Sequence, residues 1–468
     1  MKFKAWLLIF GACFLYWAYL IPNTEMQIIY DSIDYEATGR LIFEQGWLEF
    51  FRTGPHREPL YPAVIALSMA LAEFFSTQYQ PILKIIQVGF LFLGQLFLLA
   101  LLKRIQVRDS IIKAAVLYIG ISPALINAAL SVYSEIVSLP FVAAAAWVAS
   151  VLCGRIRDQT TPTQALWGPS LALGFCLGML AMGRGVFEYV LYIYLVIAAG
   201  YATVIAFQRN GFLLVRFLAS MSLVFSIPFL GVAFVKTMNL THNGSDVFAR
   251  THSSIVLASS FKRSQSISAI SVGAHLATIP GTGVCRMLFS EKDCRYADWY
   301  GTEDLRTTLV KDEFAKIPKD RQRSEVFRLT LERIAAYPLQ YMFFSGVEAL
   351  KMPFWESTKI GFVRYPDILT RVYDNPGIRL GLRLVIGLIT LGSLIFATLA
   401  LWRSRRGRAE KPDCRECMET LFIVLFMIAA YTVPYSLTYV VTRYALPIAI
   451  LYVVCIAFTL NSLINQRQ

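Results

Sequence analysis

Long apolar runs alternate with short polar segments along most of this chain. Ten of the runs have about the 20 residues that an α-helix needs to cross a bilayer. They comprise residues 5–22, 82–103, 111–131, 136–153, 165–182, 187–207, 212–236, 378–402, 418–438 and 443–464. Two further apolar stretches, 59–75 and 338–354, are shorter and each begins with a proline. The pattern predicts an all-α polytopic membrane protein with about ten transmembrane helices and additional juxtamembrane helices.

The composition supports this interpretation. Hydrophobic residues make up 56% of the chain and charged residues 16%, whereas charged residues approach ~25% in soluble globular proteins. The net charge of +13 comes largely from short Lys and Arg clusters beside apolar runs, where the positive-inside bias places them. The charge therefore indicates topology and, secondarily, contact with membrane lipids and phosphate-bearing lipid substrates. We expect no nucleic-acid partner.

The basic clusters orient the chain. The start, MKFK, precedes an apolar run that is longer than the ~7–15 residues of a signal-peptide core, so we expect a retained anchor with its amino end in the cytoplasm. Ten crossings then place all four internal clusters in the cytoplasm as well. These clusters occupy residues 103–113, 154–158, 208–211 and 403–411. If 59–75 alone also crossed, every later cluster would lie outside, so this stretch and 338–354 are expected at the outer surface.

This topology divides the chain into three parts. Residues 1–236 form a seven-helix membrane core, with a first external loop at 23–81. Residues 237–377 form an external loop domain of mixed, partly helical structure, and residues 378–468 form a three-helix membrane segment.

The eight cysteines belong to different environments. Cys285 and Cys294 bracket a short polar stretch of the external segment, where a disulfide is expected in an oxidising compartment. Cys414 and Cys417 form a lone C-x-x-C in a basic segment, without a second pair to complete a zinc site, and are expected as cytoplasmic thiols.

The stretch 31–62, DSIDYEATGRLIFEQGWLEFFRTGPHREPLYP, is the most unusual part of the sequence. It follows the first crossing and carries Asp31, Asp34, Arg57 and Glu58. A charge beside a membrane span is costly unless it faces water, a partner or a substrate. We therefore predict that this loop contains the active site.

The predicted topology brings further charged residues to the same face. Glu135, Arg184 and Arg443 each lie at the outer end of a predicted crossing. Arginine grips phosphate oxygens with a planar fork of donors that lysine lacks. Carboxylates and arginines at one membrane face therefore predict acid–base chemistry on a phosphate-bearing lipid.

Each of these residues also has a purely structural interpretation. Asp31 could cap a helix, with Asp34 interacting with the helix start. Glu58 could form a surface ion pair with Arg57, worth ~0–1 kcal/mol. Glu135 could favour the start of its own helix, and the arginines could extend along apolar surface to the interface.

The D-S-x-x-Y element after the first span and the R-E-P-L-Y-P corner before the second apolar helix resemble the GT-C superfamily of membrane glycosyltransferases. Within it, the likeness is to the branch of the lipid A aminoarabinose transferases and protein O-mannosyltransferases. The Y-S-E step at Glu135 and the R-Y step at Arg443 resemble the same branch. The resemblance implies a seven-helix catalytic core with an acidic base in the first loop, which matches Asp31 with Tyr35. Because Ser32 replaces the second acid of many relatives, Asp31 and Asp34 both remain candidates for the base.

The resemblance implies an inverting transferase that moves a sugar from a polyprenyl-phosphate donor to a hydroxyl acceptor, which could be a glycolipid, a glycan or a protein. It also implies a multi-pass protein of the bacterial inner membrane with its site on the periplasmic face. The predicted site comprises the catalytic Asp31, Asp34, Glu58 and Glu135 and the substrate-binding Tyr35, Arg57, Tyr61, Arg184, Arg443 and Tyr444. No metal or other cofactor is required. An O-antigen-type polymerase or ligase, or a transporter or flippase for lipid-linked sugars, is the alternative.

Overall fold

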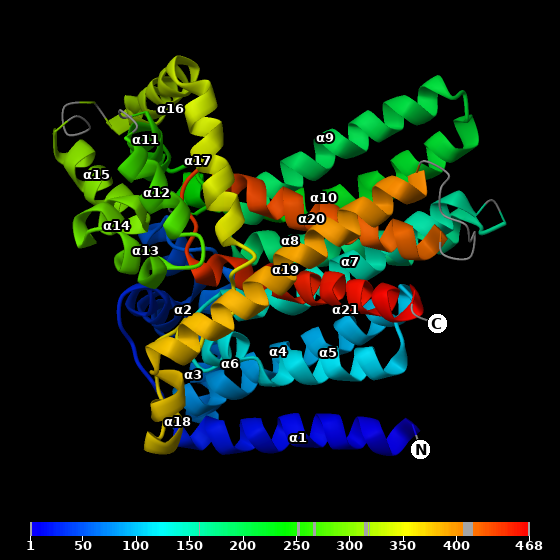
Figure 1. The fold of residues 1–468 in the computed structure, drawn as a ribbon. Coiled ribbons are helices and arrows are strands. Elements are labelled where there is room, and N and C mark those ends of the chain that lie inside the picture. Colours follow the sequence, from blue (N-terminus) through cyan, green and yellow to red (C-terminus); the bar gives the residue numbers. More distant parts are fainter. Residues whose placement is uncertain are drawn as a thin grey trace.

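The fold is seen in a computed structural model that describes residues 2–158, 160–249, 253–264, 268–312, 317, 319–405 and 415–466 (Figure 1). Regular structure in these residues is helical except for one antiparallel pair, β1 (Glu25–Met26) with β2 (Val363–Arg364). The stretch 406–414 contains Cys414 and most of the basic cluster predicted at 403–411, which therefore lie outside the described residues.

The helices follow the predicted order. The first part of the chain forms α1 (Lys2–Asn23), α2 (Asp31–Thr53), α3 (Leu60–Phe74), α4 (Tyr79–Arg104), α5 (Asp109–Ile121), α6 (Pro123–Ala129), α7 (Glu135–Arg157), η1 (Thr163–Leu166), α8 (Trp167–Gly183), α9 (Val186–Phe207) and α10 (Gly211–Asn243). A long loop segment, defined here as residues 244–375, carries α11 (Ser253–Arg263), α12 (Ala269–Ala277), α13 (Thr282–Leu288), α14 (Glu291–Ala297), α15 (Trp299–Asp312), α16 (Lys319–Ala336), α17 (Pro338–Lys351) and α18 (Asp367–Tyr373). The last part forms α19 (Pro376–Arg405), α20 (Arg415–Ser436), η4 (Thr442–Ile448) and α21 (Ala449–Gln466).

The all-α polytopic fold is confirmed. Among the described residues, nine helices are long and apolar enough to cross a membrane, and the bent pair α5 and α6 makes up to ten. The pair bends by 44° at Pro123, whose ring cannot continue the hydrogen bonding of a helix. Glu356 compensates from the loop segment, since its carboxylate accepts hydrogen bonds from Ser122 Oγ and from the Ala124 N–H, both at 2.8 Å.

The two doubtful apolar stretches form separate helices. With 15 residues, α3 is about 22 Å long, which is short of the ~30 Å hydrocarbon core. Helix α17 runs crosswise to the spanning helices (Figure 1). Neither helix has the length of a spanning helix, in agreement with the prediction that they lie at the surface.

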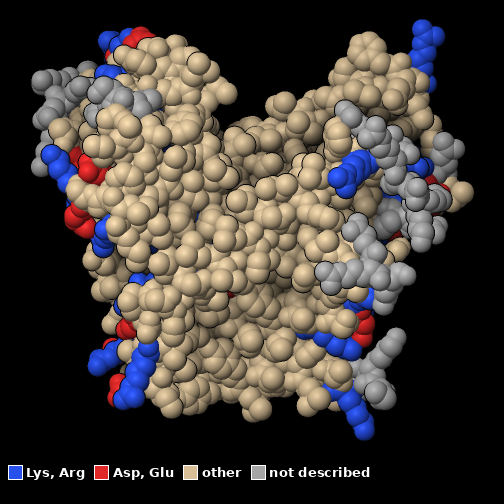
Figure 2. Space-filling model, in the orientation of Figure 1, with Lys and Arg blue, Asp and Glu red and all other residues tan. Residues whose placement is uncertain are grey.

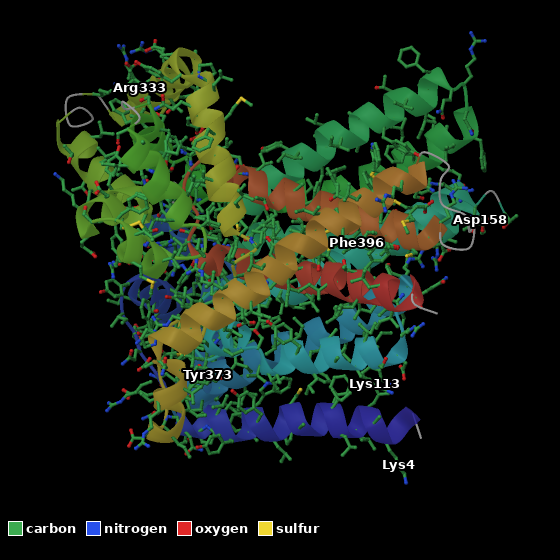
Figure 3. The ribbon with its side chains drawn as sticks, viewed as in Figure 1. Lys4, Lys113, Asp158, Arg333, Tyr373 and Phe396 are labelled. Atoms are coloured by element: carbon green, nitrogen blue, oxygen red, sulfur yellow. A yellow bond between two sulfur atoms is a disulfide. The ribbon has the colours of Figure 1, made fainter. Side chains whose placement is uncertain are left out.

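Both termini lie at the same end of the helix bundle (Figure 1), as an even number of crossings requires. We call this the terminal end and the opposite one the loop end. Charged side chains gather toward the two ends, with a broad uncharged band between them (Figure 2). Lys4, Lys113 and Asp158 lie toward the terminal end, whereas Tyr373 lies at the loop end and Phe396 within the band (Figure 3).

Helix α7 forms the centre of the bundle. Of its most apolar window, 72% is buried inside the protein, compared with 17% for α1 and α9. Small residues allow such close packing of membrane helices. A methyl group on Gly174 of α8 would lie 2.8 Å from the carbonyl oxygen of Val224 on α10, so these helices pack closely only because of the glycine.

The described part of the loop segment is mainly helical, and β2 is its one strand, in line with the mixed, partly helical structure expected there. The predicted disulfide is confirmed: Cys285 of α13 and Cys294 of α14 are bonded, with their Cα atoms 5.7 Å apart.

Candidate active site

A cavity of about 860 Å³ lies at the loop end of the bundle. Its walls come from α2, the segment before α3, the starts of α7 and α9, α15, the end of α20 and η4. Nine of the ten predicted site residues line it, namely Asp31, Asp34, Tyr35, Arg57, Glu58, Glu135, Arg184, Arg443 and Tyr444. Segments far apart in the chain therefore converge there, as the predicted topology requires.

Asp31 contacts two arginines at once. Its Oδ1 accepts a hydrogen bond from Arg57 Nη2 at 3.1 Å, and its Oδ2 is paired with Arg443 Nη2. Burial raises the pKa of Asp31, but Arg443 and then Arg57 outweigh it, so the pKa lies below its usual value. The capping interpretation is wrong for this residue, because Tyr30 occupies the N-cap position and the helix start has no side-chain cap.

Asp34 and Tyr35 follow on the first turn of α2. The Asp34 Oδ2 lies 3.6 Å from Arg57 Nη2, and 57% of its side chain is exposed, compared with 33% for Asp31. The Tyr35 hydroxyl shares a hydrogen bond with Ser134 Oγ at 3.1 Å. Asp34 is therefore the more accessible carboxylate, and Asp31 the more firmly held one.

Glu58 connects the first loop to α9. Its Oε1 accepts a hydrogen bond from the Gly185 N–H at 2.6 Å, at the N-cap position of that helix. An added methyl group on Gly185 would lie 2.9 Å from this oxygen, so the glycine permits the approach. The carboxylate satisfies a free donor at a helix start, where negative charge is favoured.

Glu135, at the start of α7, lies between two arginines. Its Oε1 is 2.7 Å from Arg184 Nη1 and 3.7 Å from Arg443 Nε, and only 4% of its side chain is exposed. Arg184 also donates to the Tyr435 hydroxyl at 2.8 Å. Because such a carboxylate is largely shielded from water, it orients the two guanidinium groups more strongly than an exposed pair could.

Tyr444 lies beneath both of these arginines. The guanidinium carbons of Arg184 and Arg443 are 5.6 and 5.7 Å from the centre of its ring, and Arg443 also lies 4.8 Å from the ring of Tyr133. Cations over aromatic faces are stabilised by the ring quadrupole. Tyr133 also lines the cavity and was not among the predicted site residues.

Tyr61 does not line the cavity, although it was predicted to bind substrate. It is fully buried, and its hydroxyl donates to Gln87 Oε1 at 2.8 Å. Its ring packs edge-to-face against Tyr35, with 5.0 Å between ring centres. Tyr61 thus contributes to the site indirectly, by packing against Tyr35.

One wall of the cavity was not predicted at all. It comes from the loop segment and the turn after α20. It includes the polar and aromatic residues Trp299, Tyr300, Glu303, Arg306 and Tyr439, together with Ile255, Ile360 and Phe362. The cluster WYGTEDLR at 299–306 was a possible signal, since it combines aromatic and charged residues in a short stretch.

Within the described ranges, no group of three or more His, Cys, Asp or Glu side chains could hold a metal ion. The carboxylates Asp31 and Glu135 are paired with arginines instead.

No family model and no curated protein matches this chain. Two solved structures are similar to it. The crystal structure of ArnT from Cupriavidus metallidurans in the apo state is 12% identical, and the alignment covers 94% of this chain and 78% of that one with a TM-score of 0.38. The crystal structure of ArnT from the same organism bound to undecaprenyl phosphate is 14% identical. Its alignment covers 97% of this chain and 77% of that one, with a TM-score of 0.33. At these TM-scores, the function must come from the site.

Proposed function

We propose that this protein is a GT-C-type membrane glycosyltransferase that moves a sugar from a polyprenyl-phosphate donor to a hydroxyl acceptor. The observation that carries the proposal is the cavity at the loop end of a membrane bundle, where Asp31 and Glu135 alternate with three arginines. A lipid-linked donor needs a phosphate site at the end of apolar helices and a base beside it, and this cavity offers both.

The arginines are suited to hold the donor phosphate. Arg57 and Arg443 are oriented by Asp31, and Arg184 by Glu135. A phosphate group offers several charged oxygens that match the guanidinium fork. When the bond from the phosphate to the sugar breaks, the same groups stabilise the negative charge that develops on the leaving oxygen.

Donor binding can also activate the base. While two arginines contact Asp31, its carboxylate is a weak proton acceptor, because its pKa is held below the usual value. A phosphate that attracts Arg57 and Arg443 weakens these contacts, and the pKa of Asp31 then rises toward its usual value. The base would thus become effective only with donor present.

The transfer itself is a single displacement. The acceptor hydroxyl gives its proton to Asp31 while its oxygen forms a bond to the anomeric carbon. The bond between that carbon and the phosphate oxygen breaks, polyprenyl phosphate leaves, and the configuration at the anomeric carbon inverts. Glu135 and Glu58, predicted as catalytic acids, are proposed to position the arginines and α9 respectively, because their carboxylates already bind Arg184 and the Gly185 N–H.

Replacing Arg443 with alanine should weaken donor binding. Loss of a charge-assisted contact costs about 1.5–3 kcal/mol, which corresponds to roughly a 10- to 150-fold rise in Kd. Arg443→Lys should recover only part of the affinity because lysine lacks the fork. The measurement is titration of the purified chain in nanodiscs with undecaprenyl phosphate.

Arg364→Ala is the matched control, since Arg364 is exposed at the loop end and does not line the cavity. It should bind undecaprenyl phosphate as the unchanged protein does. Equal affinity in Arg443→Ala would remove Arg443 from the phosphate site.

The proposed orientation places the loop end outside the cytoplasm. Single cysteines introduced at Ser76 and Gln78, between α3 and α4, should react with an impermeant thiol reagent in intact cells. A cysteine at Arg108, between α4 and α5, should react only after the membrane is opened. The opposite labelling pattern would show that the loop end lies in the cytoplasm.

A further inference from the structure

Five aromatic side chains form a continuous row along the cavity, which we call the aromatic row. Its ring centres are 4.6 Å apart for Tyr435 and Tyr444, 6.2 Å for Tyr444 and Tyr439, 6.3 Å for Tyr439 and Trp299, and 3.9 Å for Trp299 and Tyr300. Successive rings are tilted by only 25–32°. All five residues line the cavity.

The row joins the proposed reaction centre to the loop segment. At one end, Tyr435 accepts a hydrogen bond from Arg184, and the neighbouring Tyr444 lies against Arg184 and Arg443. At the other end, Trp299 and Tyr300 begin α15, and 40% of Tyr300 is exposed. A molecule lying along the row would therefore reach from the phosphate site to the solvent side of the cavity.

Polar groups flank the outer half of the row. The Tyr439 hydroxyl donates to Glu303 Oε1 at 3.2 Å, and Arg306 Nε donates to Glu303 Oε2 at 2.7 Å. The Glu303 and Arg306 side chains keep 22% and 30% of their surface exposed. They retain the capacity to exchange hydrogen bonds with a ligand beside the rings.

These features match the chemistry of a sugar. A pyranose has an apolar face of C–H groups that packs on an aromatic ring, and a rim of hydroxyl groups that bind carboxylates and guanidinium groups. An extended peptide would instead need an open strand edge or a groove for its backbone. None of the residues of the two described strands, β1 and β2, lines the cavity, so no described strand edge borders the row.

An interfacial belt is the simplest other explanation for these rings. Belt residues anchor a protein at the head-group level with their rings facing lipid. The aromatic row instead faces the cavity, and it continues onto α15 of the loop segment. An interfacial belt also does not explain why Glu303 and Arg306 lie beside the aromatic row.

We propose that the aromatic row is a saccharide-binding subsite for the acceptor, so that the acceptor is a glycan or glycolipid and not a protein hydroxyl. This inference rests on the proposed function, because it places the donor phosphate at the arginine end of the row. The sugar ring of the acceptor lies on Tyr439 and Trp299, with its hydroxyl groups toward Glu303 and Arg306. Its reactive hydroxyl points toward Asp31.

Saccharide binding tests the subsite without any transfer reaction. The full chain in nanodiscs is mixed with cellobiose, chitobiose and mannobiose, and saturation-transfer NMR measures binding at millimolar concentrations. We expect at least one disaccharide to bind, and Trp299→Ala to weaken it about tenfold, as the loss of an aromatic contact should. Trp299→Phe should restore most of the binding, and Tyr300→Ala, at the exposed end of the row, should also weaken it.

Two controls make the result specific. Phe327→Ala removes an aromatic side chain of α16 that is 65% exposed and does not line the cavity, so it should leave binding unchanged. Asp31→Asn should also bind the disaccharide. If Asp31→Asn keeps full transfer activity while saccharide binding still depends on Trp299, the proposed mechanism is wrong but the saccharide subsite is supported.

The inference is overturned if no disaccharide binds, or if Trp299→Ala and Tyr300→Ala bind as the unchanged protein does. It is also overturned if a serine- and threonine-containing peptide binds in a Trp299-dependent manner while the sugars do not.

Discussion

Replacing Asp31 with asparagine is expected to lower the rate of sugar transfer by about 10² to 10⁴, the usual contribution of a general base. Asparagine keeps the shape of the side chain but cannot accept the acceptor proton. The measurement is transfer of labelled sugar from its polyprenyl phosphate by the purified chain, together with donor affinity and thermal unfolding.

Donor binding separates a catalytic role from a structural one. In the unchanged protein, the Asp31 carboxylate competes with the donor phosphate for Arg57 and Arg443. Asp31→Asn removes this competition, so the variant should bind undecaprenyl phosphate at least as well while transfer is lost. If Asp31 only organised the arginines, affinity and activity would fall together.

Asp34→Asn is the matched control, since Asp34 lies on the same turn and is more exposed. Its effect on transfer should be much smaller. Full activity in Asp31→Asn with loss in Asp34→Asn would assign the base to Asp34. Activity in both variants would contradict the transferase mechanism and favour a polymerase or ligase, which needs no acidic first loop.

Glu135→Ala is expected to cause the largest loss of stability, about 3–5 kcal/mol, because it leaves a buried charge without its partner. Arg184 loses a carboxylate at 2.7 Å in a setting where only 11% of its own side chain is exposed. Denaturant titration of the purified protein in mild detergent measures this change in the free energy of unfolding. Transfer should also fall, since Arg184 and Arg443 would no longer be held.

A double variant distinguishes the two consequences. Glu135→Leu combined with Arg184→Met replaces the pair with apolar groups and should recover much of the stability, but not the transfer. Glu325→Ala is the control for an exposed pair, because Glu325 contacts Arg328 on the surface of α16, and it should cost about 0–1 kcal/mol. If Glu135→Ala were no more costly than this control, the carboxylate would not be essential to the site.

The membrane helices could be predicted from the sequence because their formation depends on local properties. A bilayer leaves a spanning segment no partner for its backbone except itself, so length and apolarity largely determine which runs become helices. The count of basic clusters then placed the carboxylates and arginines at one end. The disulfide was also predictable, because Cys285 and Cys294 are only nine residues apart.

The pairing inside the site could not be predicted in this way. Asp31 pairs with Arg443, which is 412 residues away in the sequence. No local pattern predicts whether a carboxylate pairs with Arg57, Arg184 or Arg443. Tyr61 illustrates the same limit, since it follows the motif that lines the cavity but turns inward to Gln87.

By itself, the sequence determined the order of the membrane helices, their number to within one, and the end of the bundle at which the predicted site residues gather, because bilayer thickness and charge act on each segment separately. Only the tertiary structure decided which of those residues face the cavity, which carboxylate holds which arginine, and that α15 contributes Trp299 and Tyr300 to its wall. The physical reason is that contacts among side chains depend on how distant segments pack against one another, and a charge or a ring has no preferred partner until that packing places one beside it.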